Sequence, residues 1–213
     1  MSLPNFLTDK YRDWKKNSYL LNKELYTHLG TKGQKPKVMI ISCCDSRVEP
    51  NQIFNGRPGD FFIHRNVANL VPEYSNDYKI NNEIISSIEY GVISLKISNI
   101  IILGHSNCGG IEYAYNKFYN KNLDNKESYL DNWIQSIKII FKKINKNLSK
   151  KDTLNLLEKR SIVNSITNIK NYPEVKSLLL QNKIKLHGLF FDISSGDLSI
   201  YNETSHRFES ISH

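Results

Sequence analysis

Short apolar runs alternate with longer amphipathic stretches along most of this chain, a pattern typical of α/β proteins. Each apolar run is bounded by polar or turn residues and predicts a buried strand; the runs cover 37–42, 60–64, 99–103 and 183–191. Apolar residues at helical spacing fall between them, over 82–95, 129–148, 152–170 and 174–182. The alternation predicts a mostly parallel central sheet that is flanked by helices.

Two further segments complete the predicted fold. Residues 4–29 carry large apolar side chains at helical spacing and predict an amphipathic helical arm, which would pack either on its own domain or on a neighbouring subunit. Segment 192–201 has a Ser-Gly-Asp turn between two short runs and predicts a hairpin. We therefore expect one α/β domain over 1–213, with about four parallel strands, an antiparallel edge strand and an N-terminal arm over 1–30.

Composition narrows the class of protein. The chain has 213 residues, of which 39% are hydrophobic, and a formal charge of +8. The excess Lys residues lie among Asn and Ser at helical spacing, which is typical of a solvated face and argues against nucleic acid as a partner. Nothing approaches about 18 consecutive apolar residues, so no membrane partner is expected. Three cysteines do not make a disulfide framework, and we expect a reducing, cytoplasmic location.

Soft metal ligands follow two of the predicted strands. Cys43 comes directly after 37–42, and His105 and Cys108 follow 99–103. In open α/β sheets ligands bind at the carboxyl ends of strands, so these residues are expected to meet in one crevice. Two sulfurs and one imidazole suit tetrahedral zinc, and three protein ligands leave one position for water. Zinc lowers the pKa of such a water to about 7, which predicts hydroxide chemistry at neutral pH.

Asp45 and Arg47 follow Cys43 at alternate positions, and in an extended chain alternate side chains face the same way. Cys44 would then point away and serve as a small buried hydrophobe. Beside a metal, Asp45 can accept a hydrogen bond from the metal's water while Arg47 keeps the carboxylate ionised and oriented. Released from Arg47, Asp45 could instead become a fourth ligand and close the site. Both states are compatible with the sequence.

Three motifs together resemble the β-class carbonic anhydrases. The family's C-x-D-S-R and H-x-x-C-G-G signatures occur at Cys43–Arg47 and His105–Gly110, and its P-G-[DE]-x-F-x-x-R-N-[IV]-A-N pattern occurs at Pro58–Asn69. The match runs through most of the chain. It implies reversible hydration of CO2 to bicarbonate and a proton through a zinc-bound hydroxide.

The resemblance also assigns roles to individual residues. It implies Cys43, His105 and Cys108 as the ligands of one Zn²⁺ per subunit, and Asp45 with Arg47 as the catalytic pair.

A substrate pocket for CO2 and bicarbonate is implied as well. In plant-like members a Gln nine residues before the first Cys reaches the active site across a dimer interface, and Gln34 holds that position. The apolar wall of the pocket corresponds to Phe62, Val67 and Tyr90, and Gly109 of the second signature adjoins it. The resemblance therefore implies a homodimer, or a tetramer or octamer built from it.

Two departures refine the resemblance. A second branch of the family builds a non-catalytic bicarbonate site from Trp, Arg and Tyr; those positions are Ile40, Arg65 and Phe191 here, which favours the plant-like branch. Where some plant-type members have a His implicated in proton export, this chain has Ser94, so the proton would leave through Tyr90, buffer or another route. Hydrolysis of carbonyl sulfide or carbon disulfide is the enzymatic alternative. A purely structural zinc protein is disfavoured, because such sites usually close with four protein ligands.

Overall fold

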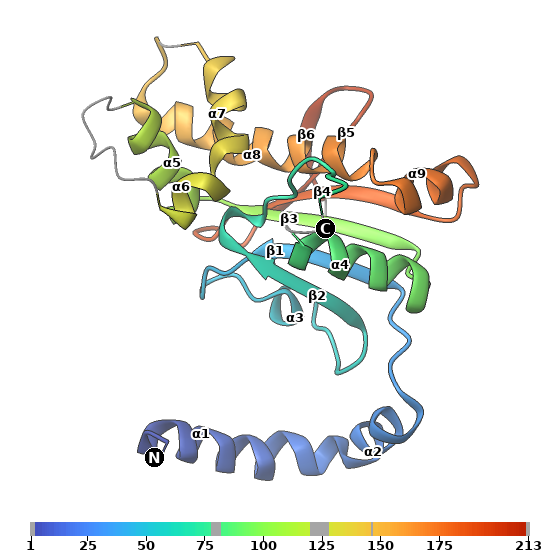
Figure 1. Ribbon diagram of the computed structural model, residues 1–213. Helices are drawn as coiled ribbons and strands as arrows, with labels where there is room; N and C mark the ends of the chain where they lie inside the picture. The colour runs from blue at the N-terminus through green and yellow to red at the C-terminus, as the bar shows by residue number, and fades with distance from the viewer. Residues whose placement is uncertain (1–2, 78–81, 120–127, 146, 212–213) are drawn as a thin grey trace.

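The computed structural model describes residues 3–77, 82–119, 128–145 and 147–211. Six strands form one sheet in the order β2-β1-β3-β4-β5-β6 (Figure 1). Their bounds are β1 Val38–Cys43, β2 Phe61–Asn66, β3 Asn99–His105, β4 Lys185–Phe191, β5 Leu198–Asn202 and β6 Arg207–Ser210. β2, β1, β3 and β4 run parallel, whereas β5 and β6 are antiparallel to their neighbours. The predicted mostly parallel sheet with an antiparallel edge is confirmed.

The structure adds one strand to those predicted, because β6 pairs antiparallel with β5 at the edge of the sheet. The pattern of this strand gives little signal: its residues are Arg-Phe-Glu-Ser, and only Phe208 is partly buried. The Phe208 ring lies 5.3 Å from that of Tyr201 on β5. One aromatic contact with the neighbouring strand therefore accounts for an element that lacks the alternation of a longer strand.

Helices and single helical turns connect the strands. Their bounds are α1 Asn5–Trp14, η1 Lys15–Tyr19, η2 Leu20–Asn22, α2 Lys23–Lys32, α3 Pro50–Ile53, η3 Val67–Asn69, α4 Asn82–Glu89, η4 Tyr90–Ser94, α5 Gly109–Tyr119, α6 Tyr129–Trp133, α7 Gln135–Lys142, α8 Lys150–Ile169 and α9 Pro173–Leu180. The predicted stretch 129–148 is divided because Ile134 leaves helical geometry, with φ −81° and ψ 2°. Among the helices of the described residues, none combines the length and apolarity needed to cross a bilayer.

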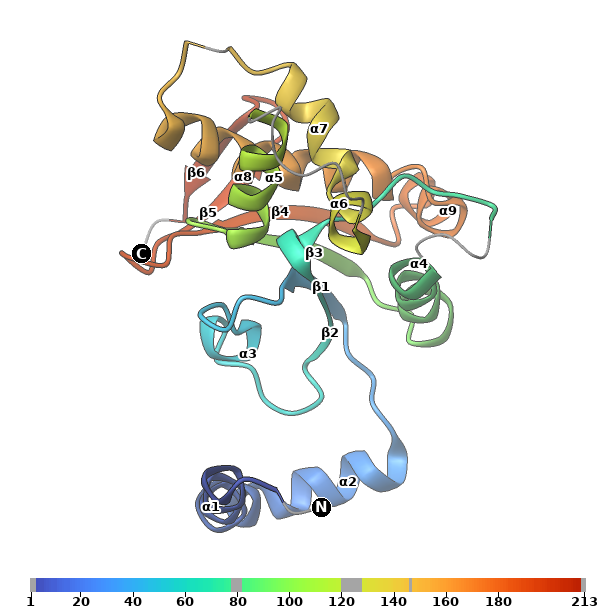
Figure 2. The same ribbon diagram turned by 60° about the vertical axis from the view of Figure 1, so that its left-hand side comes forward.

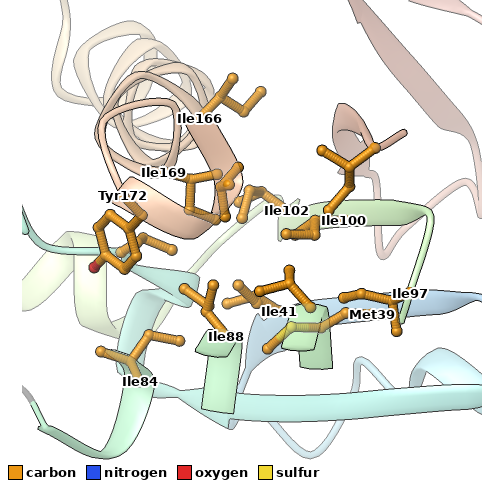
Figure 3. Packing of buried hydrophobic residues seen from close by; sticks show 14 of the residues in the cluster. Met39, Ile41, Ile84, Ile88, Ile97, Ile100, Ile102, Ile166, Ile169 and Tyr172 are labelled. Atoms are coloured by element: carbon orange, nitrogen blue, oxygen red, sulfur yellow. The ribbon is translucent and has the colours of Figure 1, made fainter. Parts of the chain in front are cut away.

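The main core lies between one face of the sheet and helices α4, α8 and α9 (Figure 3). Alternate residues of β1 and β3 supply its centre: Met39, Ile41, Ile100 and Ile102. Ile84 and Ile88 of α4, with Ile166 and Ile169 of α8, close over them. Each fully buried side chain of this kind contributes about 1.5–3 kcal/mol to the free energy of unfolding. The core holds β1 and β3 side by side, and both strands end at the site described below.

The opposite face of the sheet has a smaller core. Ile40, Leu103 and Leu189 are buried there beside Val48, which precedes α3. Several strand residues on this face are only partly buried: Val38, Phe61, Ile63, Ile101 and Phe191. The single chain therefore leaves part of this face accessible.

The N-terminal arm is helical, as predicted, and stands apart from the sheet in both views (Figures 1 and 2). None of α1, η1, η2 and α2 contains a buried residue. Leu29 approaches the turn at Gly59, but Phe6 and Leu21 are 61% and 82% exposed. The arm thus keeps most of its apolar surface off its own domain.

Candidate metal centre

Cys43, His105 and Cys108 lie together at the carboxyl edge of the sheet. Cys43 ends β1, His105 ends the neighbouring strand β3, and Cys108 precedes α5. Their ligand atoms all lie within 4.8 Å of one another, and all three residues are buried. The two sulfurs are 3.9 Å apart. Parallel pairing of β1 and β3 is what converts a long separation in sequence into one cluster.

The imidazole of His105 has the tautomer that a metal ligand needs. Its Nδ1 lies 2.9 Å from the carbonyl oxygen of Ser106. Because a carbonyl only accepts, Nδ1 carries the proton and Nε2 keeps a free lone pair. Nε2 is buried without a hydrogen-bond partner among the described residues. A buried unpaired nitrogen beside two sulfurs fits a soft cation such as zinc.

The two thiols already behave as one ligand pair. The sulfurs of Cys43 and Cys108 are in hydrogen-bond contact, and this contact lowers the pKa of Cys43 well below its usual value. The same contact, with burial, raises the pKa of Cys108. The pair therefore shares one proton, and a divalent cation would replace it, since zinc binds thiolates.

Asp45 lies beside this cluster and is held by Arg47. Arg47 Nε donates to Oδ1 at 2.9 Å and Nη2 donates to Oδ2 at 2.7 Å, in a two-point pair. These hydrogen bonds keep the pKa of Asp45 well below its usual range. Oδ2 is 4.0 Å from Nε2 of His105. The carboxylate thus remains ionised close to the ligand atoms while it is engaged by the guanidinium.

Arg65 supports the loop that carries Asp45, a role that sequence analysis missed. Its Nε donates to the carbonyl of Cys43 at 2.9 Å, and Nη2 donates to the carbonyls of Asp45 and Val48, each at 2.8 Å. Nη1 pairs with Glu49 at 2.7 Å. One side chain therefore fastens the whole turn after β1. Arg65 lies within the motif at Pro58–Asn69, but nothing in the sequence indicated that its partners are carbonyls.

Glu158 of α8 is a second residue that sequence analysis missed. Its side chain is buried, with the residue 5% exposed, and Oε1 accepts a hydrogen bond from the Cys108 N–H at 3.1 Å. Burial raises the pKa of Glu158 to about 7. A signal did exist, because Glu158 is an acidic residue among the buried positions of α8, which include Leu157 and Ile162.

The predicted pocket residues fall into two groups. Val67 and Gly109 lie near the cluster: a side chain at Gly110 would touch Val67, whereas one at Gly109 would meet no atom within 4 Å. Gln34 precedes β1, and Phe62 is paired in register with Met39 near the start of that strand. The ends of β1 are about 17 Å apart, from the rise of 3.3 Å per residue.

Tyr90 belongs with the distant group. Its ring centroid lies 5.8 Å from that of Phe62, and its side chain is half-exposed. Gln34 is also exposed. Within one chain, these three residues are thus not brought to the Cys43 end of the strand.

The burial predicted for Cys44 was wrong. Cys44 is not among the three clustered ligands of the described residues, as expected, but it is exposed and not the small buried hydrophobe that was predicted. β1 ends at Cys43, so Cys44 lies in the loop beyond the covered part of the sheet.

Comparisons with known proteins agree with this geometry. A family model described as carbonic anhydrase matches residues 38–198. Beta carbonic anhydrase 3 of Arabidopsis thaliana is 34% identical over 191 residues, which are 88% of this chain and 72% of that protein. A carbonic anhydrase of Helicobacter pylori (strain J99) is 32% identical over 205 residues, which are 93% of this chain and 90% of that protein.

Solved structures show the same fold. The β-carbonic anhydrase CcaA is similar with a TM-score of 0.89 and 26% identity, over 97% of this chain and 98% of that chain. A tetrameric β-carbonic anhydrase of Sordaria macrospora has a TM-score of 0.76 at 24% identity, over 98% of this chain and 96% of that one. Family model, relatives and fold together show that this chain belongs to the β-class carbonic anhydrases.

Proposed function

We propose that this protein catalyses the zinc-dependent, reversible hydration of CO2 to bicarbonate and a proton. The observation that carries the proposal is the pairing of a three-ligand cluster with an ionised carboxylate. Cys43, His105 and Cys108 supply three ligand atoms, and Asp45 lies beside them without joining them. A structural zinc site would be expected to supply a fourth protein ligand.

Cys43, His105 and Cys108 would hold the zinc ion. Zinc in such a site lowers the pKa of water to about 7 and so supplies a hydroxide nucleophile at neutral pH. Asp45 would accept a hydrogen bond from the attacking nucleophile and so orient its lone pair toward the carbon of CO2. Arg47 keeps Asp45 ionised for this task, since its two hydrogen bonds favour the charged carboxylate.

The site is proposed to work with Asp45 on Arg47 and not on the metal. Both oxygens of the carboxylate are engaged by the guanidinium. Arg47 is itself tied to the Asn107 carbonyl at 2.9 Å. Moving Asp45 toward the sulfurs would break two charge-assisted hydrogen bonds, which are stronger than neutral ones.

A two-fold dimer would complete the pocket. Gln34, Phe62 and Tyr90 lie toward the start of β1, whereas the ligands of the same chain lie at its end. We infer that these three residues serve the partner's site, beside Val67 and Gly109 of that partner. Gln34 would hydrogen-bond a CO2 or bicarbonate oxygen, and the rings would form the apolar wall.

The helical arm over 1–30 is proposed to pack on the partner subunit, because its apolar side chains are exposed in the single chain. Larger assemblies, a tetramer or an octamer, would repeat this dimer. The free thiols of the three cysteines support a reducing, cytoplasmic location.

Assignment to the plant-like branch is also a proposal. The guanidinium of Arg65 is occupied by three carbonyls and Glu49. Ile40 is fully buried, and neither it nor Phe191 offers a polar group. These positions thus provide no obvious donors for a second bicarbonate.

Stopped-flow CO2 hydration against pH, with zinc content measured on the same sample, tests the function. We expect about one zinc per subunit and a rate that rises with an apparent pKa between about 7 and 9. Zinc without CO2 hydration at any pH would indicate a structural site. Faster release of sulfide from carbonyl sulfide or carbon disulfide than hydration of CO2 would favour the alternative hydrolase.

A further inference from the structure

One peptide unit beside the metal cluster is held at both ends by side chains of opposite charge. The carbonyl of Asn107 accepts from Arg47 Nη2 at 2.9 Å, and the N–H of Cys108 donates to Glu158 Oε1 at 3.1 Å. This carbonyl and this N–H belong to the same peptide bond. The cation meets the negative end of the peptide dipole, and the carboxylate meets the positive end.

The clamp is continuous with the Asp45–Arg47 pair. Nη2 of Arg47 donates both to Asp45 Oδ2, at 2.7 Å, and to the Asn107 carbonyl. Because a peptide unit is planar and stiff, displacement of its N–H end also displaces its carbonyl end. A chain of hydrogen bonds therefore runs from Asp45 through Arg47 and the peptide to Glu158.

Burying the carboxylate of Glu158 at this position costs free energy. The residue is 5% exposed, and no salt bridge joins it to a Lys or Arg within the described ranges. A buried carboxylate without a cationic partner is destabilising, so a purely structural role would be met better by a neutral side chain. The backbone that it contacts is itself strained, since Asn107 has φ 56°.

We propose that Glu158 is a positioning residue for the zinc site. Through the Asn107–Cys108 peptide it fixes the sulfur of Cys108 and the guanidinium of Arg47, and so helps to keep Asp45 beside the metal position and not in it. This inference rests on the proposed zinc site. Its residues come from three parts of the chain: the loop after β1, the loop before α5, and the middle of α8.

Glutamine is the informative replacement for Glu158. The carboxylate receives the N–H groups of both Asn107 and Cys108. A glutamine amide has nearly the same shape but carries no charge, so the charge-assisted hydrogen bond from the Cys108 N–H would become a weaker neutral one. Glu158→Gln therefore disturbs the clamp without leaving a cavity.

The experiment measures zinc release from the zinc-loaded, full-length protein into an excess of a chromophoric chelator. The variants are Glu158→Gln, Arg47→Ala and the double variant. The matched control is Ser165→Ala: Ser165 lies on the same helix, is buried, accepts from the Val71 N–H at 3.0 Å and donates to the Asn69 carbonyl at 3.4 Å, and neither partner belongs to the loop before α5. Thermal unfolding is recorded for every variant.

We expect Glu158→Gln to release zinc about 10- to 100-fold faster than the wild type, the usual effect of losing a partner of a metal ligand. The double variant should release zinc within about 2-fold of the Arg47→Ala variant, because Arg47→Ala already breaks the clamp and leaves Glu158 little further effect. Ser165→Ala should lower thermal stability but leave zinc release within about 2-fold of the wild type.

Release at the wild-type rate from Glu158→Gln, or a double variant whose effect is the product of the single effects, would overturn the inference while leaving the zinc site standing. A wild-type protein that binds no zinc would instead overturn the proposed function, and this inference with it. If Glu158→Gln does not fold, Glu158→Asp takes its place. Its shorter side chain keeps the charge but not the reach, and it should also release zinc faster.

Discussion

The sulfur atoms of Cys43 and Cys108 lie 3.9 Å apart, although 65 positions separate these residues in the chain. Two parallel strands carry the flanking segments to one edge of the sheet, and His105 adds its buried Nε2 to the pair. The two sulfurs share one proton, and a divalent cation in its place would allow both to be thiolates, because its charge offsets their mutual repulsion.

Cys43→Ala and Cys108→Ala should each lose zinc and CO2 hydration together, since two ligands do not hold the ion as three do. The matched control is Cys44→Ala, which removes an exposed thiol next to the site and should keep both. Elemental analysis per subunit and stopped-flow hydration provide the measurements. Full activity in zinc-free Cys43→Ala would contradict the assignment.

Asp45→Asn should retain zinc but hydrate CO2 about 10²-fold more slowly. The amide keeps the shape of the side chain, yet it lacks the charge that orients the nucleophile and pairs with Arg47. Zinc content and kcat are measured on the same preparation. A wild-type kcat in a zinc-loaded Asp45→Asn protein would remove Asp45 from the mechanism.

Mixed dimers test whether Gln34 acts across the interface. One chain carries Gln34→Ala with an intact metal cluster, and the other carries Cys43→Ala with an intact Gln34. If Gln34 serves the partner, each mixed dimer has one complete site and about half of the wild-type activity. If Gln34 serves its own chain, no site is complete, and activity should not exceed that of the Gln34→Ala homodimer.

The burial of His64 predicts that the stability of the fold changes with pH. Its Nδ1 lies 3.1 Å from Ser87 Oγ on α4, and burial lowers the pKa of His64 below its usual 6.5, while Glu83 opposes the shift. The unfolded chain then binds a proton more readily than the folded one. The contribution of the neutral His64 to the free energy of unfolding is therefore fully present above pH 6.5 and is lost as the pH falls below that value.

His64→Gln should weaken this acid-side loss, by at most about 1.4 kcal/mol per pH unit. Urea unfolding of both proteins at several values between pH 7.5 and about pH 5 measures the difference, in which groups common to both proteins cancel. Parallel stability curves would show that His64 is protonated equally in the folded and unfolded chains.

Much of the fold was readable from the sequence, because apolar periodicity is a local property. The runs before Cys43 and His105 predicted the strands that carry the site, and they did so from neighbouring residues alone. The short strand β6 gave too little alternation to be seen. Its formation depends on the finished edge of β5, with which it pairs.

The sequence by itself predicted the candidate ligands and the Asp45–Arg47 motif, since each depends on residue types at close spacing. Only the tertiary structure decided which distant groups support them. The carbonyls bound by Arg65 and the N–H bound by Glu158 are backbone groups, which every residue carries and no motif records. The folded chain also decided that Phe62 of β2 and Tyr90 lie toward the start of β1, because strand pairing and ring contacts join residues that are far apart in the sequence.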